Sequence, residues 1–481
     1  MKSHLSLRKK VPVLFLVFLF IAFCSGCQKD ILETDNMDDQ GSGNLKSAKT
    51  TNLMVITKSE TLPAGFEQKL SLYGQIISST PEIGMIVIQP ANSKVKSQIA
   101  KLSEVKAVVP DLVVSWLEPS DVIEEMNPPS IGDDEYFFSL GYLWGLDAIN
   151  APEAWNTGNT GEGAKVYILD SGIDKDNPDL DDNLNTELST SFVPGEEYFV
   201  RDGSFFSHGT HVAGTIAAAD NGWGVIGVAP HAEIVAVKVL SEYSGSGAFS
   251  WVNQGIVYAA NNGADVINMS LGAWLNRNGN YLDDNYVWQQ APAFDLQFLI
   301  LAQQRAVNYA VKKGAVVIVS AGNEAINADG NASLFKLPAD LENVIAVSAT
   351  APDYIFGNPQ GSLDILASYS NYGKSLVKLA APGGDFDFYP AVYYHFDMIL
   401  STGAGPDPAT GGWYFFWAAG TSMATPHVSG VAALIAGSNG GEISPSNLIK
   451  QLFETADKID GMGISPYYGN GRVNAYRAVT E

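Results

Sequence analysis

The chain has 481 residues, of which 46% are hydrophobic and 17% charged, and this composition excludes a protein that is disordered throughout. At this length two or three domains are expected. Acidic residues outnumber basic ones by 52 to 28, and the net charge of −24 would repel a phosphate backbone, so nucleic acid is not expected as a partner.

The N-terminus has the pattern of an export signal, predicted over residues 1–27. Basic residues at positions 2–10 precede the apolar run Val11–Phe23, which is too short for a permanent membrane anchor. Cys27 then follows a Ser-Gly pair, and the segment resembles a bacterial lipoprotein signal with Cys27 as the acylated residue. Cys24 departs from the aliphatic residue usual there, so simple secretion is the alternative. A lipid on Cys27 would be the protein's only attachment to a membrane.

Two segments without periodicity flank a small folded unit. Residues 28–50 are polar and predict a flexible tether, and residues 119–140 are acidic, contain prolines and predict an exposed linker. Between them, residues 51–118 predict a small α+β domain with these expected elements: strands at Leu53–Ile56, Met85–Ile88, Val105–Asp111 and Leu112–Val114, and a helix at Ser97–Leu102.

Residues 141–481 alternate apolar strand-like runs with helical segments. This alternation predicts an α/β fold of three layers, αβα, with a mostly parallel sheet covered on both faces. The expected strands are Val166–Leu169, Ile234–Leu240, Val266–Met269, Ala315–Ser320, Val344–Ser348 and Val377–Ala380, and the expected helices include Thr215–Ala219, Phe249–Asn261, Leu296–Lys313 and Val428–Ala436.

Polar residues follow three of these strands. Asp170 ends the first, Ser270 follows the run at 266–269, and Asn323 follows the run at 315–320. Ligands of open parallel sheets bind at the carboxyl ends of the strands, so a carboxylate, a hydroxyl and an amide are predicted at one edge.

A histidine and a serine lie in distinctive surroundings. His208 is part of Ser-His-Gly-Thr-His-Val-Ala-Gly, and Ser422 is part of Gly-Thr-Ser-Met-Ala-Thr-Pro-His, ahead of a helix. A serine at a helix start has a backbone N–H and a positive dipole end that suit a developing oxyanion. Taken singly, Asp170, His208 and Ser422 would each be read as structural residues, and their joint occurrence favours catalysis.

The segments 168–174, 208–215 and 420–426 resemble the three signature motifs of the subtilisin-like serine proteases, and the order Asp, His, Ser matches as well. The resemblance extends over about residues 142–480. It implies a serine endopeptidase that acts on polypeptides, with Ser422 as nucleophile, His208 as base, and Asp170 orienting the imidazole. Asn323 matches the oxyanion-hole amide of the family. The chemistry needs no cofactor, and a monomer is expected.

The resemblance also implies how substrate is held. Gly245-Ser246-Gly247 and Ser270-Leu271-Gly272 match the two extended segments that sandwich a substrate backbone as added strands. The pocket for the side chain before the cut bond, called here the first specificity pocket, should involve 319–322 and 336–338. A large apolar or aromatic side chain is the family default there.

A structural calcium ion is a further implication. The matching ligands are the side chains of Asp179 and Asn221 and the carbonyls of Ala219, Trp223 and Val225, all of which are hard oxygen donors. The glutamine that completes the site in relatives corresponds to Leu140 in an ungapped alignment. Either the site is weaker, or another residue closes it.

By position and size, residues 51–118 correspond to the inhibitory propeptide of the family, which implies a ferredoxin-like α+β fold for this unit, with maturation cleavage expected within 116–140. Two stretches are long for the family, 276–298 and the aromatic-rich 385–416. Both are expected at the rim of the cleft, where they would restrict or select substrates, and a small separate core under a long loop is the alternative.

Three other function classes were weighed. A binding lipoprotein that kept the fold without activity would lack reactive residues, but all matched catalytic positions hold them. An esterase or acyl transferase would use the same triad with another acceptor. A zinc site on His208 and His211, three residues apart, would need a catalytic Glu that the motif lacks.

Overall fold

The computed structural model describes residues 52–117, 122–126, 135–201, 206–330 and 333–481. The predicted export signal 1–27, its Cys27 and the tether 28–50 therefore lie outside the described residues. Within the described ranges, no helix combines the length and the apolar character that a bilayer span requires.

The first described unit is a βαββαβ domain. Its four strands form an antiparallel sheet in the order β2-β3-β1-β4, the ferredoxin-like arrangement that was predicted. Side chains alternate along β1: Leu53 and Val55 pack on the two helices of the unit, and Met54 and Ile56 face the opposite way. The elements are β1 (Leu53–Thr57), α1 (Phe66–Leu70), β2 (Gly74–Thr80), β3 (Met85–Pro90), α2 (Val95–Ile99) and β4 (Val105–Pro110).

A larger sheet organises the rest of the chain. Its order is β18-β17-β15-β11-β7-β9-β8, with β19 also paired to β17, and only β18 runs antiparallel. The strands are β7 (Lys165–Asp170), β8 (Thr190–Ser191), β9 (Glu233–Lys238), β11 (Val266–Met269), β15 (Val316–Ser320), β17 (Val344–Ala351), β18 (Ile365–Leu366) and β19 (Leu379–Pro382).

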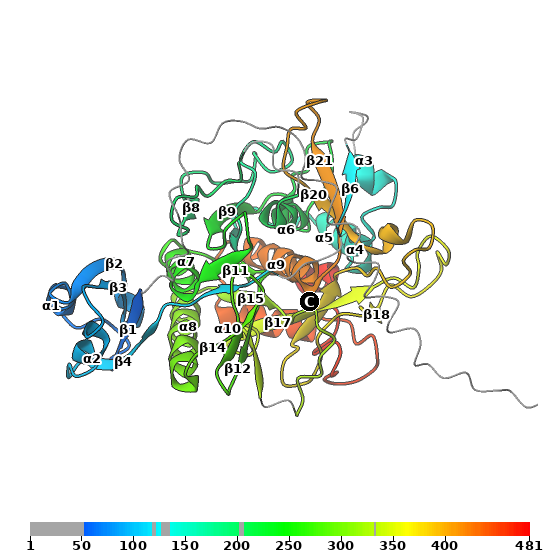
Figure 1. Ribbon diagram of the computed structural model, residues 1–481. Coiled ribbons are helices and arrows are strands. Elements are labelled where there is room, and N and C mark those ends of the chain that lie inside the picture. The colour runs from blue at the N-terminus through cyan, green and yellow to red at the C-terminus, as the bar shows by residue number, and fades with distance from the viewer. Residues whose placement is uncertain (1–51, 118–121, 127–134, 202–205, 331–332) are drawn as a thin grey trace, which may run out of the picture. The chain divides into compact units, whose positions relative to one another are not determined.

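Helices cover both faces of this sheet (Figure 1). On β7, Val166 and Ile168 join the core beneath α6 (His208–Ala217) and α9 (Thr421–Ser438). Tyr167 and Leu169 point the other way, toward α7 (Phe249–Asn261) and α8 (Ala293–Lys313). Because both faces are buried, the strands are continuously apolar rather than alternating, and the predicted three-layer αβα fold is confirmed.

Shorter elements complete the fold. The helices are α3 (Tyr136–Ser139), α4 (Trp144–Ala148), α5 (Ala151–Trp155), α10 (Pro445–Glu454) and α11 (Ala475–Thr480). There are three small sheets among the described residues of this part. One pairs β5 (Val113–Ser115) with β10 (Ser246–Ala248), and a second contains β12 (Ala273–Asn276), β13 (Asn280–Leu282), β14 (Trp288–Gln290) and β16 (Leu334–Leu337). The third contains β20 (Ile399–Thr402), β21 (Tyr414–Ala418) and β6 (Val122–Met126).

Some element boundaries differ from those expected. The helix expected at 215–219 begins seven residues earlier, at His208, because Ser207 caps it by accepting a hydrogen bond from the Thr210 N–H. The helix expected at 97–102 lies at Val95–Ile99. Within the predicted linker, residues 122–126 form β6, whose backbone pairs with β21.

Candidate active site

The three polar strand ends meet at one edge of the sheet, as predicted. Asp170 is the last residue of β7, Ser270 directly follows β11, and Asn323 lies just beyond β15. Strand β11 lies between β7 and β15, and all three run parallel. Their carboxyl ends therefore bring a carboxylate, a hydroxyl and an amide to the same side of the molecule.

Asp170 and His208 form a buried pair at this edge. His208 Nδ1 lies 2.9 Å from both carboxylate oxygens of Asp170. The Asp170 side chain is 1% exposed and that of His208 is 10% exposed. Helix α6 approaches this closely because its second residue is Gly209: a Cβ there would come within 2.3 Å of the Gly172 carbonyl oxygen. The pair fixes the proton of a neutral imidazole on Nδ1 and leaves Nε2 as the basic nitrogen.

Ser422 is the second residue of α9, and its surroundings are tied to Ser270. Its Oγ donates to the Ser270 carbonyl over 3.2 Å, and the Ser270 hydroxyl donates to the Ser422 carbonyl over 2.8 Å. That carbonyl is available because Pro426, four residues on, has no N–H to complete the helical bond. Within the described residues no hydrogen bond joins Ser422 Oγ to the His208 ring.

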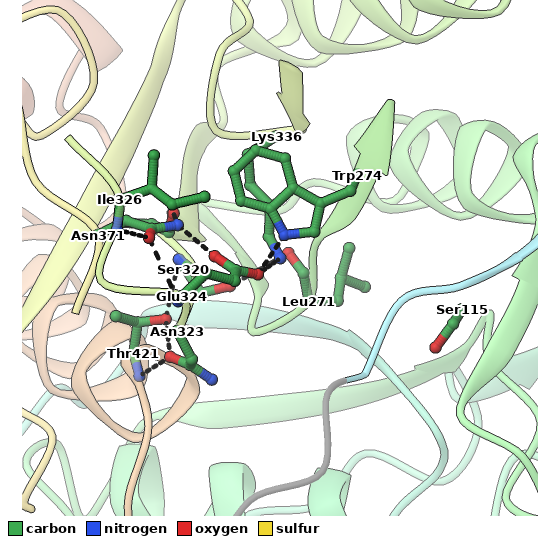
Figure 2. A network of polar contacts seen from close by, with 12 residues as sticks. Ser115, Leu271, Trp274, Ser320, Asn323, Glu324, Ile326, Lys336, Asn371 and Thr421 are labelled. Carbon is green, nitrogen blue, oxygen red and sulfur yellow. Dashed lines mark hydrogen bonds and ion pairs between the residues drawn. The ribbon is translucent and has the colours of Figure 1, made fainter. Parts of the chain in front are cut away.

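The Asn323 amide is oriented from one side. Its Oδ1 accepts hydrogen bonds from the Thr421 N–H over 2.9 Å and from the Thr421 hydroxyl over 2.8 Å, as Figure 2 shows. With the oxygen occupied, the Nδ2 donor is directed away from Thr421. A Cβ placed on Gly420 would lie 3.5 Å from this Nδ2, so the amide lies beside the start of α9. A fixed neutral donor of this kind suits a charge that forms only in a transition state.

Both predicted substrate segments are paired with the stretch 113–117. Strand β10 pairs antiparallel with β5, and Gly245 O accepts hydrogen bonds from the N–H groups of Trp116 and Leu117, each over 3.2 Å. On the other side, the Gly272 N–H donates to the Trp116 carbonyl over 2.8 Å. An extended chain thus lies between the segments 245–248 and 270–272 as an added strand.

The family follows from comparison with known proteins. The sequence model of the subtilase family, peptidase S8, matches residues 161–471. The chain is 35% identical to a thermophilic serine proteinase of Bacillus sp. (strain AK1), over 83% of this chain and 82% of that protein. It is 37% identical to thermitase of Thermoactinomyces vulgaris, over 72% of this chain and 98% of that protein.

The chain belongs to the subtilase family. Since its relatives are serine proteinases, it is a serine-type endopeptidase. The fold agrees: the crystal structure of the epidermin leader peptide processing serine protease of Staphylococcus aureus matches with a TM-score of 0.68 at 24% identity, over 89% of this chain and 97% of that one.

Two further histidines of this subtilase are buried and have structural contacts. His211 Nε2 lies 3.1 Å from the Ile399 carbonyl and 3.0 Å from the Phe416 carbonyl, which ties α6 to β20 and β21. Burial lowers the pKa of His211 to about 3 and that of His427 to about 4, so both are neutral at ordinary pH. With its Nε2 proton held by two carbonyls, His211 is not arranged to share a zinc ion with His208.

The loop expected to bind calcium surrounds a buried acid. Asp179 is fully buried; its Oδ2 accepts the Val225 N–H over 3.0 Å, and its Oδ1 has no hydrogen-bond partner among the described residues. Burial raises the pKa of Asp179 well above its usual range, and nearby Glu135 adds to the shift. The Asn221 side chain bonds within the loop, accepting from the Trp223 N–H and donating to the Pro178 carbonyl.

Glu135 is a residue that the sequence comparison missed. Its side chain reaches the same loop from the segment before α3, and its Oε1 accepts the N–H groups of Asn221 and Gly222, each over 3.1 Å. Leu140, the residue that an ungapped alignment places there, is 46% exposed. Two buried carboxylates with an unsatisfied oxygen fit a hard divalent cation.

The two long stretches have different locations. In 276–298, the Tyr286 hydroxyl donates to the Leu117 carbonyl over 2.8 Å, so this stretch borders the extended chain as expected. In 385–416, Phe415 is buried in the main core with its neighbour Trp417, and Phe396 packs against that core, so these side chains extend the main core and do not form a separate one.

Proposed function

We propose that this subtilase hydrolyses peptide bonds with Asp170, His208 and Ser422 as its triad, through an acyl-enzyme. The observation that carries the proposal is the buried Asp170–His208 pair, with both carboxylate oxygens 2.9 Å from Nδ1, at the same sheet edge as Ser422. Among the described residues, the other ring nitrogen of His208, Nε2, has no hydrogen-bond partner. That arrangement is what a general base needs.

The proposed reaction starts with a change at Ser422. Its hydroxyl turns from the Ser270 carbonyl toward His208, and Nε2 takes the proton as Oγ attacks the substrate carbonyl carbon. The Asp170 carboxylate stabilises the imidazolium. The oxyanion is stabilised by Asn323 Nδ2 and by the Ser422 N–H, which has no acceptor within α9 because it belongs to the first turn. His208 then protonates the leaving amine, and water attacks the acyl-enzyme by the same route.

We infer that residues 51–118 are an inhibitory propeptide. The stretch 113–117 uses the backbone groups of both substrate segments, and substrate cannot use them at the same time. Trp116 strengthens this attachment: its side chain is buried, its indole N–H donates to the Gly247 carbonyl over 3.0 Å, and its ring packs edge-on against Phe249 with centroids 5.1 Å apart. Removing the propeptide would free the cleft.

We further propose export, with Cys27 lipidated and cleavage between 116 and 140 releasing the mature enzyme. The basic and apolar pattern of the N-terminus supports export, and Glu135 and its contacts support a cut upstream of residue 135. N-terminal sequencing of the processed protein tests the cleavage: a mature chain that starts before Leu53 would contradict it.

We also propose that calcium binds between Asp179 and the loop 219–225. Asp179 and Glu135 would supply carboxylate oxygens, and Asn221 and the carbonyls of the loop would complete the ligand set. The ion would neutralise buried charge and stabilise the fold, without a part in the reaction.

Hydrolysis of peptides by purified enzyme tests the proposed function. The wild-type enzyme should cleave internal bonds of unstructured polypeptides, and Ser422→Ala should lose at least about 10³-fold in kcat. Ser438→Ala, a hydroxyl loss at the exposed far end of the same helix α9, is the matched control and should stay close to wild type. Turnover of esters without turnover of any peptide would instead identify an esterase.

A further inference from the structure

An ion pair between buried Lys336 and half-buried Glu324 occupies the place where the side chain before the cut bond enters. Given the proposed function, the bond must lie over Ser422 with its oxygen toward Asn323, and the substrate backbone must run along 270–272. Its side chain then enters between the strand ends of β11 and β15. These ends are joined by the Ser320 hydroxyl, which donates to the Leu271 carbonyl over 3.1 Å, and they separate beyond that bond.

Lys336 fills the space between the separated ends. It lies on β16, opposite Trp274 of β12, and its side chain is 2% exposed. A Cβ on Gly272 would come within 2.4 Å of Lys336 Cε, and one on Gly322 within 2.9 Å. The lysine stem is therefore in contact with the backbone of both segments, and only glycine leaves room for it at either position.

Several contacts hold the lysine in this place (Figure 2). Its Nζ lies 2.7 Å from Glu324 Oε1 and 4.9 Å from the centre of the Trp274 ring. The Trp274 indole N–H also donates to Glu324 Oε1, and the Asn371 amide donates to Oε2. In turn Asn371 Oδ1 accepts the N–H of Ile326 over 2.9 Å. The glutamate is thus fixed by groups from three chain segments.

We propose that Lys336 and Glu324 make the first specificity pocket short and electrically neutral, so that the enzyme cleaves after small uncharged side chains such as alanine and serine. A phenylalanine or tyrosine would need the volume of the lysine stem. Displacing the stem would part the ammonium of buried Lys336 from its carboxylate partner, which is unfavourable. Because the pair has no net charge, neither an acidic nor a basic side chain is favoured. This deepens the proposed function and departs from the aromatic preference implied by family resemblance.

Profiling cleavage of a mixed peptide library with the wild-type enzyme is the first test. Alanine or serine before the cut bond should exceed phenylalanine and tyrosine in kcat/KM by at least about tenfold, a typical discrimination by pocket size. Equal or better cleavage after aromatic residues would overturn the proposal. If no peptide is cut at any position and Ser422 is not labelled by a phosphonate, the proposed function fails and the pocket with it.

Paired double variants separate the volume of the lysine from its charge. Glu324→Gln with Lys336→Gly removes both charges and the stem, whereas Glu324→Gln with Lys336→Met removes both charges and keeps the bulk. The glycine variant should raise kcat/KM for phenylalanine relative to alanine by about 10- to 100-fold, and the methionine variant should keep the wild-type order. The same profile for both variants would overturn the proposal. Should either variant fail to fold, the wild-type profile still decides.

Discussion

As the proposed oxyanion donor, Asn323 would be prepared for a charge that is absent from the ground state. Thr421 holds the amide oxygen with two hydrogen bonds, so the orientation of the donor is set before substrate arrives. Such preorganisation costs nothing at the moment of reaction, and for this reason it lowers the barrier.

Replacing Asn323 by alanine should lower kcat by about 10²- to 10³-fold and leave KM almost unchanged, because the lost bond exists only in the transition state. Steady-state kinetics on one peptide substrate measures this. Asn327→Ala, in the same loop, is the control and should stay within about threefold of wild type. A tenfold rise in KM with unchanged kcat would show that Asn323 binds substrate instead.

Among single residues, the candidate site residues that stand in short local motifs could be predicted from the sequence. Asp170, His208, Asn323 and Ser422 each stand in a distinctive stretch, and the parallel strands bring two of those stretches, those of Asp170 and Asn323, to one edge. Glu135 could not be predicted, because it lies 86 residues before its partner Asn221. Their contact depends on the path of the chain and not on any local pattern.

Among the elements, α8 connects the N-terminal unit to the large sheet through one buried cation. Arg305 is 9% exposed, and its guanidinium donates to the carbonyls of Thr57, Ser59 and Ile83 over 3.1 to 3.2 Å. Thr57 is the last residue of β1, Ser59 follows it, and Ile83 lies in the turn before β3, so one guanidinium joins the ends of two strands.

Arg305→Ala should loosen the N-terminal unit, because three buried carbonyls lose a charged donor. In an uncut Ser422→Ala precursor, amide hydrogen exchange in β1 to β4 should accelerate by at least about tenfold. Lys312→Ala, an exposed position on the same helix, should leave exchange unchanged. If the amides of β1 to β4 exchanged at the same rate with and without Arg305→Ala, this role of Arg305 would be contradicted.

Asp111 should make the same interface sensitive to pH. It is buried at the start of α7, where its carboxylate accepts from the hydroxyl of Ser250 over 2.6 Å and from its N–H over 3.1 Å. Burial raises the pKa of Asp111 from 3.8 to about 6 despite these bonds. The folded state therefore holds the proton more tightly than the unfolded chain, and this contribution is complete below about pH 4 and lost as pH rises through 6.

The comparison is between the uncut Ser422→Ala precursor and the same precursor carrying Asp111→Asn. As pH rises from 4 to 7, the free energy of unfolding should fall by up to about 3 kcal/mol more in the precursor that keeps Asp111. Urea titrations at several pH values measure this difference. Other buried acids such as Asp397 are present in both proteins, so their contributions cancel. Parallel pH profiles for the two proteins would contradict the assignment.

Apolar runs predicted most strands of the large sheet, since both of its faces are buried. Strand β2 was missed because its sequence, Gly-Gln-Ile-Ile-Ser-Ser-Thr, has only two apolar residues and is partly exposed. The start of α6 was missed because glycine, threonine and histidine have low helix propensity, and tertiary contacts with β20 outweigh it.

For the molecule as a whole, the buried acids near the loop 219–225 lead to a prediction about stability. If calcium binds there, it favours the folded state by an amount that grows with its concentration relative to Kd, about 2.7 kcal/mol at 100 times Kd. A chelator should therefore lower Tm by several degrees, and added calcium should restore it.

Asp179→Asn should abolish this calcium dependence, and Glu135→Gln should weaken it. Differential scanning calorimetry of the mature enzyme with calcium, with magnesium and with chelator provides the measurement. An equal Tm in all three conditions would show that the two acids are neutralised by protons instead of a cation.

Chemical labelling of the nucleophile tests most directly whether Ser422 acts in a triad with His208 and Asp170. The mature enzyme is treated with a fluorophosphonate, digested, and the modified residue is identified by tandem mass spectrometry. One adduct is expected, on Ser422. It should form slowly in Asp170→Asn, because the imidazole is no longer oriented, and be absent in Ser422→Ala. An adduct on another serine, or labelling of Ser422 that is equally fast without Asp170, would contradict it.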